Sequence, residues 1–127
     1  MKEIICFDFD GVINSYTSGW QADDIITDEP MEGIRELLEE LKKRGFSIYI
    51  MSCRSGSMEG RTAMWEWLKK YNMHNLVDHI CAYKPPALVY VDDRGMNFNG
   101  STEGLLEKIV SFQTWWERKE GDHGREE

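Results

Sequence analysis

Two pairs of acidic residues, each placed directly after an apolar run, offer the clearest chemistry in this chain. Asp8 and Asp10 follow the first run, and Asp92 and Asp93 follow a run much later in the sequence. Because such runs are typical of buried parallel strands, we expect the carboxylates to gather at one edge of a sheet. Like charges so placed repel one another unless a cation holds them. The pattern therefore predicts a site for a hard divalent ion with oxygen ligands, such as Mg²⁺.

The first pair also suits a reaction at phosphorus. Asp8 can be a nucleophile toward phosphorus when a cation neutralises the charge of the incoming phosphate. Asp10 can reach the same side and act as general acid and then as general base. Gly11 permits a tight turn that brings the backbone close to a bound phosphate. A surface Asx turn after a strand explains the Asp-x-Asp spacing equally well by itself.

A hydroxyl and two cations complete the set of candidate residues. Ser52 and Cys53 follow a second apolar run, and a hydroxyl with free backbone N–H groups at a strand-to-helix turn suits a phosphate oxygen. A serine there is more commonly a simple cap. Arg54 either adds charge to this phosphate site or makes a surface ion pair. Lys84 either holds phosphate as a point charge or is a solvated loop lysine.

These residues need a scaffold, and the chain alternates strand and helix signals. Strands are predicted at 3–9, 46–51, 77–81 and 87–91, the second covered on both faces and the last buried. Helices are predicted from Pro30 to a cap at Gly45, after Ser57, and after Ser101 or Thr102. This order predicts an α/β fold with one doubly wound, mostly parallel sheet.

One domain accounts for the chain of 127 residues. Residues 1–116 are predicted to form the core, with Trp115 and Trp116 closing the last helix, and 117–127 a charged, flexible tail. In the second helix Trp65 fits the apolar face, whereas Trp67 is expected to be half exposed.

Composition excludes several classes of function. The net charge of −8, without a basic stripe, argues against stable binding of duplex nucleic acid. The apolar runs are far shorter than the ~20 residues that span a membrane, and no signal-peptide pattern precedes the first strand. Three widely spaced cysteines are typical of reduced, mostly buried thiols, which predicts a cytoplasmic protein.

Together, these motifs resemble those of the haloacid dehalogenase-like hydrolase superfamily over most of the chain. Its D-x-D-G-V motif is similar to residues 8–12, its strand-end hydroxyl to Ser52, its lysine to Lys84 and its terminal acidic motif to Asp92-Asp93. An aspartate at position 10 is what the phosphatase branch shows. More narrowly, the chain looks like compact members of the superfamily found in phages and prophages.

The resemblance implies a strand order of about 3-2-1-4, a mechanism and a set of ligands. Asp8 would form an aspartyl-phosphate, and Asp10 would be the general acid and base. Ser52 and Lys84 would hold the phosphoryl group. Mg²⁺ would be bound by Asp8, the Asp10 carbonyl and the Asp92/Asp93 pair, and which of these two contacts the ion directly is left open.

No cap domain fits between Gly11 and the first helix, and the resemblance then implies an open site. Such a site suits a bulky phosphorylated substrate, such as a nucleic-acid end or a phosphoprotein, or it is completed by an oligomer partner. The loop of residues 14–20 would be a flap. Tyr16 and Trp20 in it either stack on a base or sugar, or pack on the loop itself.

Two other functions fit parts of the pattern. A response-regulator receiver domain also uses acids, a hydroxyl and a lysine around Mg²⁺, but its acceptor aspartate follows a middle strand, and the middle strand here ends at Ser52. A regulatory module that binds Mg²⁺ and phosphate without turnover would contain the same residues as the enzyme. The sequence favours the phosphatase and leaves its substrate and oligomeric state open.

Overall fold

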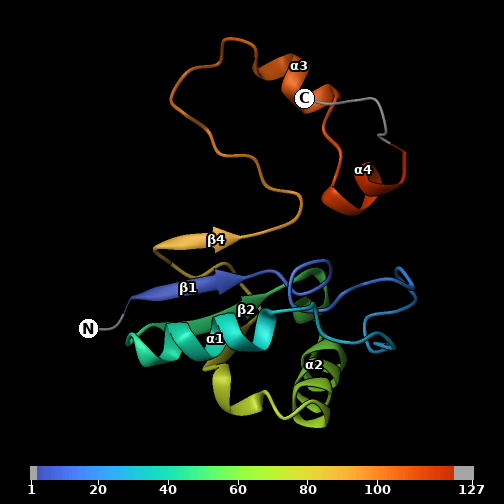
Figure 1. Cartoon of the computed structure of the whole chain (residues 1–127), viewed down its shortest axis with the longest axis vertical. Helices are drawn as coiled ribbons and strands as arrows, with labels where there is room; N and C mark the ends of the chain where they lie inside the picture. Colours follow the sequence, from blue (N-terminus) through green and yellow to red (C-terminus); the bar gives the residue numbers. More distant parts are fainter. Residues whose placement is uncertain (1–2, 122–127) are drawn as a thin grey trace. The chain divides into compact units, whose positions relative to one another are not determined.

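The computed structural model describes residues 3–121 and divides the chain into two compact units, Met1–Asp92 and Asp93–Glu127 (Figure 1). All four strands belong to the first unit, and two short helices belong to the second. The acidic, hydroxyl and lysine candidates, apart from Asp93, are therefore parts of the first unit.

A single parallel sheet organises the first unit. Its strands are β1 (Ile4–Phe7), β2 (Ser47–Met51), β3 (His79–Cys81) and β4 (Val89–Val91). Their order is β3-β2-β1-β4, and every neighbouring pair is parallel. Figure 1 accordingly shows the arrowheads of β1 and β4 at the same edge. The predicted α/β class, the parallel sheet and the strand order are confirmed.

Burial differs between the strands. In β1 the side chains of Ile5, Cys6 and Phe7 are all buried, as expected for a central strand. In β2 only Ile48 and Ile50 are buried, and the residues between them are half-buried, so the expectation that both faces are covered is wrong. The period-2 pattern instead indicates one packed face.

The strand β4 was expected to be buried, and this expectation is wrong. All three of its residues are exposed. Both β3 and β4 are edge strands, but β3 also packs against η1, whereas the main packing partner of β4 is its neighbour β1. An apolar run predicts a strand, but the same run fits an edge as well as a centre.

The helix α1 (Ile34–Lys43) begins later than predicted. Pro30 is not in its first turn but forms an isolated bridge with Asn14. Gly33, with a φ of 83°, then separates this extended segment from the helix. At the other end Gly45 caps the helix as predicted, with a φ of 94°. Its N–H donates to the carbonyl of Lys42 at 3.0 Å, which is part of a Schellman motif.

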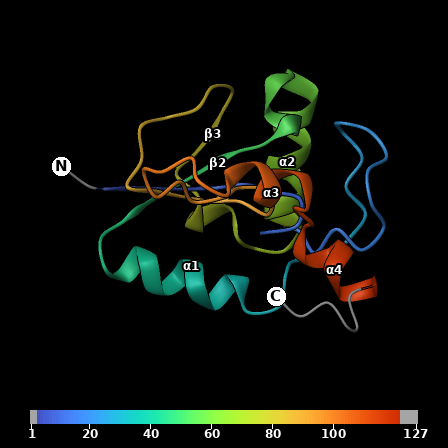
Figure 2. The ribbon, with the colours of Figure 1, turned by 90° about the horizontal axis from the view of Figure 1, so that it is seen from above.

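The helix α2 (Met58–Lys70) is capped by Ser57, whose Oγ accepts the N–H of Gly60 at 2.9 Å, as predicted. Trp65 is half-buried and packs against the core, in line with its predicted place on the apolar face, but the prediction that Trp67 is half exposed is wrong, because it is only 4% exposed. The Trp67 ring packs edge-on against Phe9, with ring centroids 4.9 Å apart. Figure 2 shows α1 and α2 lying apart from each other.

Short elements complete the first unit. The 3-10 helices η1 (Cys53–Gly56) and η2 (His74–Leu76) follow β2 and α2. Between β1 and α1 the described chain has turns and isolated bridges but no helix or strand. Apolar side chains from the sheet, from α1 and α2 and from the loop after β1 form the core. Its fully buried members include Phe7, Phe9, Ile13, Leu38, Ile48, Ile50, Met64 and Leu68.

The second unit contains α3 (Leu105–Val110) and α4 (Trp115–Gly121). The predicted caps at Ser101 and Thr102 are wrong, since α3 starts directly after Gly104, whose φ is 77°. Trp115 and Trp116 begin α4 instead of closing the preceding helix. The predicted tail is thus helical from residue 117 to 121, and its residues 122–127 lie outside the described part.

The cysteines have the distribution that the sequence predicts. Cys6 and Cys81 are buried, Cys53 is exposed, and all three are free thiols. In the described part of the chain no helix combines the length and the apolar character that crossing a membrane requires.

Candidate functional site

Two of the predicted acidic side chains meet at the carboxyl edge of the sheet. Phe7 pairs with Val91, so Asp8 and Asp92 are the residues that directly follow the paired strands. The N–H of Asp8 continues the ladder by donating to the carbonyl of Val91 at 2.8 Å. One carboxylate oxygen of Asp8 and one of Asp92 lie within 4.8 Å of each other. Parallel pairing thus unites residues from opposite ends of the first unit.

This pair has the chemistry of a hard cation site. Both donors are carboxylates, Asp8 half-buried and Asp92 exposed. Mg²⁺ is bound through one or two protein carboxylates and keeps several waters, so these two residues fit it. Asp93 is the first residue of the second unit, where its carboxylate accepts a hydrogen bond from Trp116 Nε1 at 2.9 Å.

The charges at this edge influence the pKa of the Cys6 thiol. Its pKa is raised to about 11, first by burial, then by the neighbouring Cys81, and further by Asp8 and Asp92. Lys84 acts in the opposite direction and lowers the pKa of the same thiol. Asp8, Asp92 and Lys84 therefore all influence the pKa of the same thiol in β1.

Lys84 lies in the exposed segment that leads into β4. Its ammonium is 4.5 Å from the centroid of the Tyr90 ring, a cation–π contact. The Tyr90 hydroxyl donates to the carbonyl of Pro85 at 2.5 Å, which fixes the ring beside the lysine. Lys84 is exposed, as a solvated loop lysine would be, but it also has a defined contact. Its role toward phosphate stays a prediction.

Ser52 occupies the turn between β2 and η1, at the same edge of the sheet. Its Oγ accepts the N–H of Arg54 at 3.0 Å, and its own N–H donates to Ser55 Oγ at 3.0 Å. These reciprocal bonds form a capping box, so Ser52 is a cap. A hydroxyl that accepts in this way still has one proton to donate, and the phosphate role stays a prediction. Cys53, next to it, is exposed.

The side chain of Asp10 accepts hydrogen bonds from Asn14 and Arg54. Asn14 Nδ2 donates to Asp10 Oδ1 at 2.9 Å. Arg54 Nε lies 3.2 Å from Oδ1 and 3.0 Å from Oδ2 of the same carboxylate. The chain reaches this geometry through Gly11, whose φ is 82° and whose N–H donates to the Asn14 carbonyl at 2.9 Å. The Asp10 side chain is 14% exposed.

Arg54 is a buried residue, with 1% of its surface exposed. The sequence suggested a surface ion pair or a contact with phosphate, and the structure pairs the buried guanidinium with the half-buried carboxylate of Asp10. Its Nη1 donates to the carbonyls of Ala22, Asp23 and Ile25 at 2.7, 2.8 and 3.2 Å. Nε and Nη1 are thus used within the protein, while a contact with phosphate stays a prediction.

The loop between β1 and α1 is organised by another acid, Asp28, which is buried. The carboxylate of Asp28 accepts from Thr17 Oγ1 at 3.0 Å and from the Ser18 N–H and hydroxyl at 2.9 and 2.6 Å. Burial opposes the charge of this carboxylate, but the hydrogen bonds from Ser18 and Thr17 outweigh it and lower its pKa. Trp20, 46% exposed, lies over the guanidinium of Arg54 at 4.6 Å.

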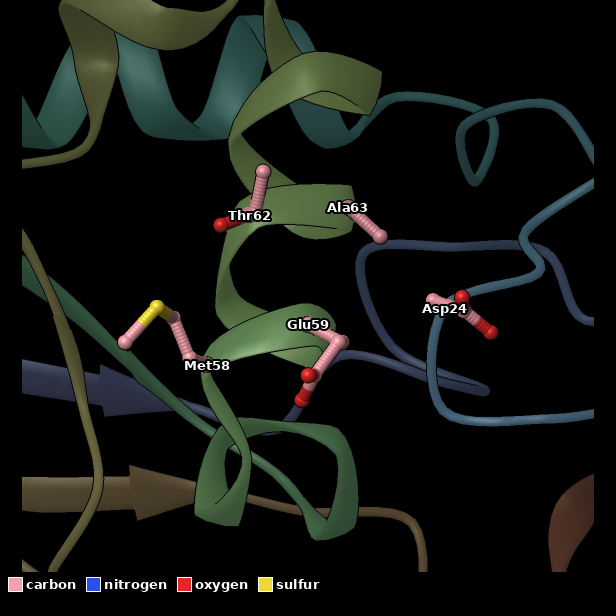
Figure 3. A pocket seen from close by; sticks show the side chains of 5 residues that line it. All are labelled: Asp24, Met58, Glu59, Thr62 and Ala63. Atoms are coloured by element: carbon pink, nitrogen blue, oxygen red, sulfur yellow. The ribbon is translucent and has the colours of Figure 1, made fainter.

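Two pockets flank α2 and the same loop. The first, of about 320 Å³, is lined by Asp24, Met58, Glu59, Thr62 and Ala63. Figure 3 shows Asp24 on the loop, across from the other four on the helix. The second, of about 350 Å³, is lined by Asp24, Ile26, Ala63, Glu66, Trp67 and Lys70. Neither is lined by the acids at the sheet edge.

Three residues of this region were not singled out from the sequence. Asn14, buried, is a partner of Asp10, and its spacing of four residues from Asp10 was the available signal. Asp28 has no local signal, because its partners lie ten and eleven residues away. Gly60, buried in the first turn of α2, lies against the carbonyl of Arg54.

Comparison with known proteins leaves the family open. No protein-family model matches the chain, and no curated protein matches it. The likeness to haloacid dehalogenase-like hydrolases therefore rests on the motifs alone.

Proposed function

We propose that this protein is a Mg²⁺-dependent phosphatase of the haloacid dehalogenase type, which hydrolyses phosphate monoesters through Asp8. The observation that supports it most is the approach of Asp8 and Asp92, from β1 and β4, to within 4.8 Å at the carboxyl edge of the sheet. Ligands of parallel α/β sheets bind at this edge.

The reaction has two steps. An oxygen of Asp8 attacks phosphorus, the bond from phosphorus to the leaving oxygen breaks, and Asp10 gives its proton to that oxygen. Water then attacks the phosphorus of the aspartyl-phosphate, and Asp10 takes up the proton of the water. Inorganic phosphate leaves, and Asp8 and protonated Asp10 are restored.

The remaining residues would bind Mg²⁺ or offset the negative charge of the phosphoryl group. Asp8, the main-chain carbonyl of Asp10 and Asp92 are the proposed ligands of Mg²⁺, which would supply positive charge for the transferring phosphoryl group. The Ser52 hydroxyl donates to a phosphoryl oxygen, and the Lys84 ammonium offsets its charge.

The substrate is the most open part of the proposal. Since residues 8–33 form no cap and neither pocket at α2 reaches the acidic edge, the site suits a phosphate on a bulky molecule. A nucleotide or the end of a nucleic-acid strand is the class we favour, within a cytoplasm that keeps the three free thiols reduced.

The test is phosphate release from a panel containing 4-nitrophenyl phosphate, nucleotides and oligonucleotides with 3′- or 5′-phosphates, with Mg²⁺ or EDTA. We expect activity that requires Mg²⁺ and falls by at least about 10³-fold in Asp8→Asn, because the nucleophile is lost. Glu66→Gln, which removes an exposed carboxylate from α2 instead, serves as the control and should retain wild-type activity.

Two results would contradict the proposed phosphatase activity or the role of Asp8 in it. Equal activity of Asp8→Asn and the wild type would reject Asp8 as nucleophile. If the wild type releases no phosphate from any substrate yet binds Mg²⁺ by calorimetry, the protein is the non-catalytic Mg²⁺- and phosphate-binding module instead.

A further inference from the structure

We propose that Arg54 is a positioning residue, which holds the carboxylate of Asp10 in one orientation and ties it to the turn of residues 22–25. This inference rests on the proposed function, because it concerns how Asp10 delivers its proton. It assigns Arg54 a role other than direct contact with phosphate.

The carboxylate of Asp10 is held from two sides. Arg54 Nε contacts Oδ2 at 3.0 Å and Oδ1 at 3.2 Å, and Asn14 Nδ2 contacts Oδ1 at 2.9 Å. Two donors from different elements fix the rotation of the carboxylate about its last bond, which a single donor leaves free.

Arg54 can act as a fixed support because it is itself immobilised. Its Nη1 lies within 3.2 Å of the three carbonyls of the 22–25 turn, and the Trp20 ring covers its guanidinium at 4.6 Å. The turn closes on itself through the Ile25 N–H, which donates to the Ala22 carbonyl at 3.2 Å. With 1% of Arg54 exposed, water does not compete for these bonds.

Gly60 fixes the backbone of Arg54 as well. A Cβ atom on Gly60 would lie 1.9 Å from the Arg54 carbonyl oxygen, so the first turn of α2 packs directly against it. Both ends of the Arg54 residue are therefore held, the backbone by α2 and the guanidinium by the loop. Displacing the guanidinium would leave the Asp10 carboxylate free to rotate about its hydrogen bond from Asn14, while Asp8 and Asp92, which directly follow β1 and β4, stay in place.

Because Asp10 and Asp8 are held by different elements, losing the orientation of Asp10 should affect the reaction differently from losing the nucleophile. A general acid matters when the leaving group is an alkoxide, which needs a proton as its bond to phosphorus breaks. It matters little for 4-nitrophenolate, which leaves as a stable anion. Loss of Asp10 orientation should therefore slow the two substrates unequally, whereas general damage to the fold or to the nucleophile should slow both.

The experiment compares kcat/KM for an alkyl phosphate and for 4-nitrophenyl phosphate in the wild type and Arg54→Lys. Lysine keeps the charge but lacks the planar fork that joins Asp10 to the three carbonyls. We expect about a 10²-fold loss on the alkyl phosphate, since misplacement of a catalytic group costs about this much, and only about a few-fold loss on the aryl phosphate. The matched control Arg61→Lys, whose Nη1 bonds the Ser55 carbonyl at 2.8 Å, should leave the ratio unchanged.

The outcomes separate this inference from the proposed function. If the wild type hydrolyses neither substrate, the proposed phosphatase function is wrong. An active wild type with an inactive Asp8→Asn, combined with equal losses on both substrates in Arg54→Lys, overturns the positioning role alone. If circular dichroism shows that Arg54→Lys is unfolded, Trp20→Leu decides: a selective loss on the alkyl phosphate supports the role, and an unchanged ratio overturns it.

Discussion

Substitution of Gly60 by alanine tests the packing on which Arg54 depends. The added Cβ would lie 1.9 Å from the Arg54 carbonyl oxygen and 2.8 Å from the carbonyl carbon. It would also lie 3.1 Å from Ser57 Oγ, the atom that caps α2 through the Gly60 N–H. Because the closest atoms belong to backbone, no rotamer change relieves the clash, and α2 must move away from η1.

The magnitude follows from two opposing effects. Overpacking of a tight site costs about 1–3 kcal/mol, and a contact this short with backbone belongs at the upper end. Alanine in a helix gains at most about 1 kcal/mol over glycine. The net loss in the free energy of unfolding is thus about 2 kcal/mol. For a unit of this size each kcal/mol lowers Tm by roughly 4–8 °C, so we expect a drop of roughly 8–16 °C.

Thermal unfolding followed by circular dichroism measures this drop, with Gly56→Ala as the matched control. Gly56 lies four residues earlier in η1, has a negative φ, and a Cβ there meets nothing within 4 Å. The control should lie within about 0.5 kcal/mol of the wild type. A Gly60→Ala variant that melts at or above the wild-type temperature would refute the proposed contact between α2 and Arg54.

Two further predictions concern titrating groups. Since hydrogen bonds lower the pKa of Asp28 below its ordinary value of 3.8, its ionised form stabilises the fold above about pH 4 and this stabilisation is lost as the pH falls toward the folded pKa. Urea unfolding at pH 7 and pH 3 should show a smaller acid-induced loss in Asp28→Asn than in the wild type, and equal losses would contradict the assignment. Because Cys6 is buried with its pKa raised to about 11, whereas Cys53 is exposed, iodoacetamide at pH 8 should label Cys53 alone in the native protein, as mass spectrometry of peptides can verify. Rapid native labelling of Cys6 would contradict its burial.

The elements that the sequence predicted well are those with local causes. The apolar run of β1, the glycine that ends α1 and the serine that begins α2 each act within a few residues of the structure they determine. The strand order is confirmed too, but it was implied by the resemblance of the motifs and not by local signals, since residues 82–88 join β3 to β4 without a helix.

The misassigned features have non-local causes. The exposure of β4 depends on which elements pack against an edge strand, and its three apolar residues do not encode this. Trp67 is off the apolar stripe of α2 but becomes buried because the loop supplies the Asp28 carbonyl to its Nε1 at 2.8 Å. The polar partner thus allows a tryptophan to enter the core where hydrophobic periodicity predicts an exposed side chain.

The same distinction explains the candidate site. The approach of Asp8 and Asp92 follows from strand topology, since the residues after two paired parallel strands must emerge at one edge. The pairing of Asp10 with Arg54 joins residues 44 apart, and it depends on the 22–25 turn, which carries no motif. A carboxylate with a buried arginine partner is strongly constrained, because either group alone would be an uncompensated charge in the interior. If Asp10 moves a proton, its placement is therefore a property of the loop as much as of β1, and changes in that loop should alter the dependence on the leaving group before they alter the nucleophile.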